Sequence, residues 1–101
     1  MEHYSSTKSR AHLEYDISRL VLDLKGKRLS RVPDAVTKLS DLKKLVLDEN
    51  NLIELPARIS KLKNLIALKL DGNKLTKLPA EIGDLKELRL LSVLFNNLSP
   101  E

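Results

Sequence analysis

Leucine and isoleucine recur along the chain at a fixed interval, and this interval is the first clue to the fold. The segment from Lys44 to Leu62 reads "KLVLDENNLIELPARISKL", and moving it forward by 23 positions brings it into register with itself. Leu45 then coincides with Leu68 and, one step later, with Leu91. Self-similarity at this spacing predicts a repeat architecture, in which each unit buries its apolar side against its neighbours.

Each unit combines two local patterns. The segments "LVL" and "LKL" place leucines at every second position, which predicts a short strand with one buried face. The segments "ARISKL" and "AEIGDL", which follow a Leu-Pro pair, space their apolar residues three apart, which predicts a short helical or 3₁₀ turn. Proline fits the start of such a turn because it has no amide proton to lose there. We therefore expect stacked units with one shared core.

The aligned units read LxxLxLxxNxLxxLPxxIxxL. This pattern resembles the leucine-rich repeat family, in the 23-residue form with "LPxxI" that is typical of intracellular members, and the resemblance covers residues 19–98. It implies an α/β solenoid, a short horseshoe, with a parallel concave sheet and short helical or 3₁₀ turns on the convex side. We expect a tail and cap at 1–17 and a repeat domain at 18–101, with repeats at 19–41, 42–64, 65–87 and an incomplete one at 88–101.

Residues 1–17 lack the repeat. Leu13 and Ile17 have helical spacing, and we expect them, with Tyr15, to cover the open core of the first repeat. The alternative is a tail that folds on a partner.

An asparagine recurs at the same place in each unit, as Asn50, Asn73 and Asn96. After each strand the chain must turn inward, and a buried backbone group left unpaired there costs roughly 1–3 kcal/mol. Asparagine carries a donor and an acceptor on a short side chain, so we expect these residues to bridge the turns of neighbouring repeats, which is also the role that the resemblance implies. In the first repeat Lys27 takes this place. Because an ammonium group accepts no hydrogen bond, we expect a looser first turn, which Gly26 can help to reshape.

The chain has a net charge of +4. Single-strand nucleic-acid binders need clustered aromatic residues for base stacking, whereas the aromatic residues here, Tyr4, Tyr15 and Phe95, are few and scattered. We interpret the basic residues as a solvated face and keep an acidic partner or nucleic acid as the weaker alternative. The basic excess lies partly near the N-terminus, at Arg19, Lys25, Lys27, Arg28 and Arg31.

The sequence predicts no catalytic residue, no cofactor and no metal site. There is no cysteine for a disulfide framework or a thiolate site, and His3 and His12 lie near the N-terminus without a carboxylate that a motif fixes beside them. No apolar run of about 18 residues and no signal-peptide core is present. We therefore expect a non-enzymatic protein without membrane association, located in the cytoplasm, with the nucleus as the alternative.

The residues that alternate with the buried leucines should form columns on the concave sheet. Leu90 and Leu94 point outward in this pattern, and Asp48 and Asp71 should lie about 5 Å apart on neighbouring strands. We expect a partner to bind this face through Val46, Asp48, Ala67, Lys69, Asp71, Leu90, Leu94 and Phe95. In the alternative interpretation, Lys44 and Lys69 neutralise the acids and the last residues fold back over Leu94. If the sheet face does not bind the partner, we expect the site on the basic outer face around Arg58, Lys61 and Lys63.

We predict a non-catalytic protein–protein interaction module, a scaffold or adaptor of the kind used in signalling. The alternative is a fragment or truncated isoform of a longer leucine-rich repeat protein with a mainly structural role. The last unit, "LRLLSVLFNNLSPE", lacks the "LPxxIxxL" half of the others. We therefore also expect self-association through this uncapped end, or dependence on a partner or a missing segment.

Overall fold

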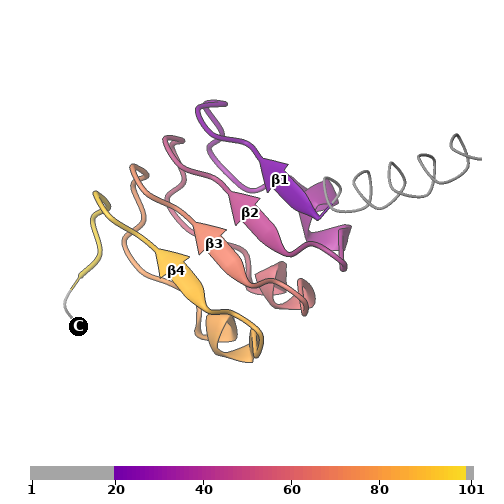
Figure 1. Ribbon diagram of the computed structural model, residues 1–101. Coiled ribbons are helices and arrows are strands. Elements are labelled where there is room, and N and C mark those ends of the chain that lie inside the picture. The colour runs from indigo at the N-terminus through magenta and orange to yellow at the C-terminus, as the bar shows by residue number, and fades with distance from the viewer. Residues whose placement is uncertain (1–19, 100–101) are drawn as a thin grey trace, which may run out of the picture.

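The structure, a computed structural model, describes residues 20–99, and a single parallel sheet forms one side of this part of the chain (Figure 1). Its strands lie side by side in chain order, and the first residues of all four strands are opposite one another in the register. The strands are β1 (Val21–Asp23), β2 (Lys44–Val46), β3 (Ala67–Lys69) and β4 (Leu90–Ser92). Strand spacing thus follows the 23-residue period of the sequence.

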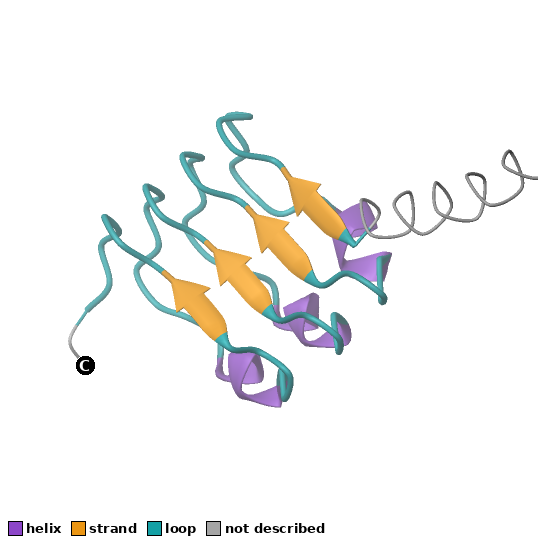
Figure 2. Ribbon diagram, in the orientation of Figure 1, coloured by secondary structure: helices purple, strands orange, loops and turns teal. Residues whose placement is uncertain are grey.

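Short 3₁₀ helices return the chain from the end of one strand to the start of the next (Figure 2). An extended proline precedes each helix, and the third residue after the proline donates its amide to the proline carbonyl, as Val36 does to Pro33 at 3.0 Å. The helices are η1 (Asp34–Lys38), η2 (Ala57–Lys61) and η3 (Ala80–Asp84). The molecule is therefore an α/β solenoid with a parallel sheet and short 3₁₀ turns, as the sequence predicts.

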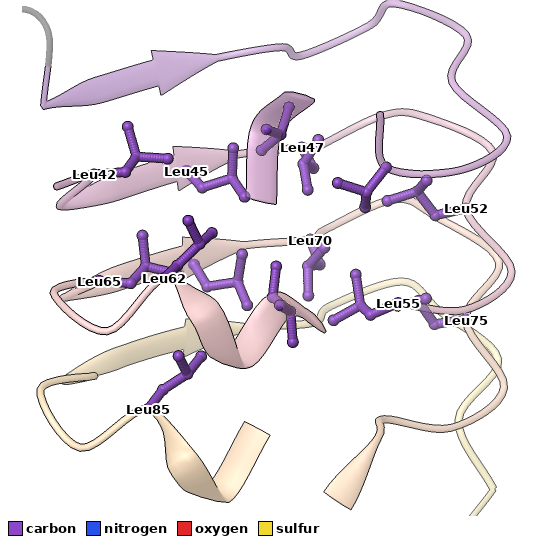
Figure 3. Packing of buried hydrophobic residues seen from close by; sticks show 14 residues of the cluster. Leu42, Leu45, Leu47, Leu52, Leu55, Leu62, Leu65, Leu70, Leu75 and Leu85 are labelled. Atoms are coloured by element: carbon purple, nitrogen blue, oxygen red, sulfur yellow. The ribbon is translucent and has the colours of Figure 1, made fainter. Parts of the chain in front are cut away.

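The core is a set of leucine columns enclosed by the strands, turns and 3₁₀ helices (Figure 3). It is deepest in the two middle repeats, where Leu45 and Leu68 are fully buried. At the two ends the residues at the same repeat position, Leu22 and Leu91, are only partly buried. Each repeat therefore depends on a neighbour on both sides to complete its core.

One turn position has a left-handed backbone in every repeat. Gly26 and Gly72 have φ of +65° and +72° there, and glycine adopts this conformation without steric cost. Glu49 and Phe95 occupy the same position with φ of +57° each. A side chain in this conformation costs roughly 1–2 kcal/mol, so the repeat imposes local strain at Glu49 and Phe95.

The expected cap residues, Leu13, Tyr15 and Ile17, lie outside the described residues. Within residues 20–99, no helix is long and apolar enough to cross a membrane.

Candidate functional site

Three asparagines tie the turns of neighbouring repeats together, and the first of them serves the turn in which Lys27 replaces asparagine. The side-chain oxygen of Asn50 accepts hydrogen bonds from the backbone amides of Lys27 and Leu29, at 3.0 and 2.9 Å. Its side-chain nitrogen donates to the carbonyl oxygen of Leu24 at 2.9 Å. Because Asn50 belongs to the second repeat, the first turn needs no asparagine of its own to satisfy these backbone groups.

Asn73 and Asn96 bridge to the repeat before them in a similar way, but each accepts from one backbone amide of that repeat where Asn50 accepts from two. The side-chain oxygen of Asn73 accepts from the amide of Leu52 at 3.0 Å, and its nitrogen donates to the carbonyl of Leu47 at 3.0 Å. Asn96 bonds to the third repeat in the same way. Each asparagine therefore reaches back to the repeat before it.

A second ladder, made of carboxylates, runs in the opposite direction. Asp48 Oδ1 accepts a hydrogen bond from the backbone amide of Asp71 at 2.8 Å. Asp71 Oδ1 accepts from the amide of Leu94 at 2.8 Å and from the hydroxyl of Ser92 at 2.6 Å. Each carboxylate therefore holds the repeat that follows it. The shared repeat position of the two aspartates is the sequence signal for this role, and the alternation of inward and outward residues does not reveal it.

Lys69 lies between the two aspartates on the outward side of the sheet. Its Nζ is 3.6 Å from Asp48 Oδ2 and 3.4 Å from Asp71 Oδ2. The hydrogen bond from Ser92 lowers the pKa of Asp71, and the Leu94 amide and Lys69 lower it further, against the raising effect of burial. The chain thus supplies a basic group to these acids itself, while Lys44 is exposed and forms no ion pair within residues 20–99.

Exposed apolar side chains lie in β4 and in the turn that follows it. Leu90 is exposed, Leu94 exposes 61% of its surface and Phe95 exposes 83%. Ala67, which is opposite Leu90 in the sheet, is half-buried. Val46 and Asp48 each expose only 8% and therefore offer a partner little surface. We call Leu90, Leu94 and Phe95 the apolar end of the sheet.

The open edge of β4 leaves backbone donors without partners. In the inner repeats, the amides of Leu70 and Gly72 donate to the carbonyls of the next repeat at 2.7 and 2.9 Å. The corresponding amides of Val93 and Phe95 make no hydrogen bond within the part of the chain that the structure describes. This edge can therefore accept another extended chain.

The basic outer surface is the alternative binding face that the sequence predicts. One of its three basic side chains, Arg58, is bonded to other residues of the chain. Arg58 forms an ion pair with Asp34 and donates from Nε to the Thr37 hydroxyl at 3.2 Å. Lys61 and Lys63 are exposed.

Residues 20–99 contain no histidine and no cysteine. His3 and His12 lie outside this range. Between residues 20 and 99, no three histidine, cysteine, aspartate or glutamate side chains gather so that they could hold a metal ion.

The repeat geometry agrees with comparisons to known proteins. A family model described as "leucine-rich repeat region" matches residues 5–100. The chain belongs to the leucine-rich repeat family. One solved structure similar to this leucine-rich repeat chain is a leucine-rich repeat protein from Leptospira interrogans, with 30% sequence identity and a TM-score of 0.51. The match covers 74% of this chain but only 31% of the Leptospira protein, so this chain spans about a third of that structure. No curated protein matches the chain.

Proposed function

We propose that this leucine-rich repeat chain is a non-catalytic interaction module that binds a protein partner through the sheet face, chiefly at its apolar end. The exposure of Leu90, Leu94 and Phe95 beside the charged group of Asp48, Lys69 and Asp71 carries this proposal. Exposed apolar side chains with a charged rim are typical of protein interaction sites.

The backbone of Phe95 supports the same proposal. Gly26 and Gly72 show that glycine suits this turn position, yet the last turn carries an aromatic residue there. The other strained residue, Glu49, has its carboxylate packed closely over Gly72. Phe95 makes no comparable packing contact within the described chain, because most of its side chain is exposed to solvent. Contact with a bound partner would stabilise this side chain and offset the cost of the strained backbone.

The charges near the apolar end define the kind of partner. Two carboxylates share one ammonium group, so the group of Asp48, Lys69 and Asp71 keeps one negative charge. The favoured partner therefore presents aliphatic or aromatic side chains to Leu90, Leu94 and Phe95 and a basic side chain to Asp71.

The "LPxxI" motif supports a partner in the cytoplasm or the nucleus, since it is typical of intracellular members of the family.

A second candidate is that this chain is one section of a longer solenoid with a mainly structural role. Its coverage of only 31% of the Leptospira structure and the free amides of Val93 and Phe95 favour this candidate. In that arrangement a further repeat would lie against β4 and bury much of the apolar end.

The experiment compares affinities for an identified partner. We expect the double change Leu90→Ser and Leu94→Ser to weaken binding at least about tenfold, since central apolar contacts dominate interface energy. Ile53→Ser is the matched control, because Ile53 exposes 57% of its surface but lies in a turn. Circular dichroism establishes that both variants fold. Equal affinity of parent, control and double variant would place the binding site elsewhere.

A further inference from the structure

An open hollow of about 450 Å³ lies beside the first turn, which follows β1. Strands β1 and β4 lie at opposite ends of the sheet (Figure 1). The walls of the hollow come from the segment after β1 and from the first residue of η1, and two of the lining residues are arginines. The lining residues are Arg28, Leu29, Ser30, Arg31, Pro33 and Asp34.

The two arginines have no acidic partner within residues 20–99. Arg28 and Arg31 are exposed and form no ion pair or side-chain hydrogen bond within residues 20–99. Asp34, the acid in the wall, is paired with Arg58 of the following repeat. Because Arg58 already neutralises that carboxylate, the hollow as a whole is strongly positive.

The turn that carries these arginines is anchored and has its own shape. The amides on either side of Arg28, those of Lys27 and Leu29, both donate to the side-chain oxygen of Asn50. Arg28 has φ of +58°, whereas the residues at its position in the other repeats do not have positive φ. These residues are Asn51, Lys74 and Asn97. The backbone at Arg28 therefore differs in conformation from the backbone at the same position in the other repeats.

We propose that this hollow binds the phosphate group of a phosphorylated serine or threonine in a protein segment. A guanidinium group pairs with two phosphate oxygens at once, and two such groups surround a single phosphate. The Ser30 hydroxyl adds a neutral donor on the same wall. The site is separate from the apolar end of the sheet and does not depend on it.

A phosphorylated peptide fits these observations better than a nucleic acid. Base stacking on aromatic side chains supplies much of the affinity of single-strand binders. Phe95, the one aromatic residue within residues 20–99, follows β4, whereas the hollow follows β1 at the other end of the sheet. Both arginines line the same hollow of about 450 Å³, and two guanidinium groups at one site suit one phosphate group better than a row of them.

The test titrates the full chain with the acetylated, amidated tripeptide Ala-phosphoserine-Ala, using backbone amide shifts in nuclear magnetic resonance. We expect saturable shifts at residues 28–31 and no shift with the unphosphorylated tripeptide. The double change Arg28→Gln and Arg31→Gln should weaken the phosphopeptide affinity at least about tenfold, since both charge-assisted pairs are lost. Glutamine keeps much of the side-chain length, and circular dichroism checks the fold.

The matched control is the double change Lys74→Gln and Lys77→Gln. These lysines occupy the same positions in the third repeat and are exposed, and their removal takes away the same charge. We expect a change in affinity below about twofold, because a general field at physiological salt is largely screened over this separation. Equal losses in the two double variants would overturn the proposal in favour of unspecific attraction. Tighter binding of oligouridylate than of the phosphopeptide at residues 28–31 would overturn it in favour of a nucleic-acid site.

Discussion

At the scale of single residues, the asparagine ladder and the aspartate ladder join neighbouring repeats in opposite directions. Asn73 satisfies backbone groups of the repeat before it, and Asp71 satisfies those of the repeat after it. The asparagine is buried, whereas the aspartate is partly exposed and shares its charge with Lys69. The two side chains should therefore respond differently to substitution and to pH.

Asn73→Leu should lower the free energy of unfolding by roughly 1–3 kcal/mol, because buried turn amides and carbonyls lose their partner. The urea midpoint measures this effect. Asn51→Leu serves as the control, since the Asn51 side chain is exposed and makes no hydrogen bond within the described residues. An unchanged midpoint for Asn73→Leu would contradict the assigned role.

Asp71 should make the fold sensitive to acid. Its pKa in the folded chain lies below the ordinary value of 3.8, so the unfolded chain binds the proton more readily. The stabilisation by the carboxylate is therefore present above about pH 4 and is lost as the pH falls through the folded pKa. In urea titrations, Asp71→Asn should be less stable than the parent near pH 7, and the difference should shrink toward pH 3. A difference that does not depend on pH would contradict this account.

Phe95→Gly should separate stability from binding. Relief of the left-handed backbone strain outweighs the added freedom of the unfolded chain, so we expect a gain of roughly 0.5–1 kcal/mol in the free energy of unfolding. Partner affinity should fall, because the exposed ring is lost. Urea unfolding and the partner-binding assay measure the two effects. A variant that is less stable than the parent would show that the ring packs against the fold.

At the scale of elements, the sequence predicts the strands and the 3₁₀ turns well, because both follow from patterns within a single repeat. Alternation places Leu45 inside, and Pro56 marks the start of η2. The direction of the two polar ladders could not be predicted, since it depends on which neighbouring turn each side chain reaches. The left-handed Glu49, Phe95 and Arg28 also escape sequence reasoning, because glycine is the residue that normally signals this conformation.

The open edge of β4 leads to a prediction of its own. Its free amides and the adjacent apolar end should allow a second copy to pair there, so sedimentation equilibrium should show dimers that form as concentration rises. Leu94→Lys should shift the equilibrium toward monomer by bringing two positive charges together at the contact. A parent chain that stays monomeric at high concentration would rule this association out.

At the scale of the whole molecule, the solenoid separates two different surfaces. The first turn carries the arginine-lined hollow, and the last repeat carries the apolar end of the sheet. The core between them is continuous, with its deepest burial in the two middle repeats. Because the two surfaces share no residue, substitutions at one should leave binding at the other unchanged.

The opposed ladders also restrict how the length of such a chain can vary. Asn73 meets partners 21 and 26 residues before it, and Asp48 meets its partner 23 residues after it. An insertion or deletion between Leu52 and Asp71 whose length is not a multiple of the 23-residue period would misalign both sets of bonds at once. A duplication of residues 65–87 would instead preserve every one of them, because the new copy brings its own Asn and Asp in phase. This architecture can therefore lengthen by the addition of whole 23-residue repeats without loss of the bonds between repeats.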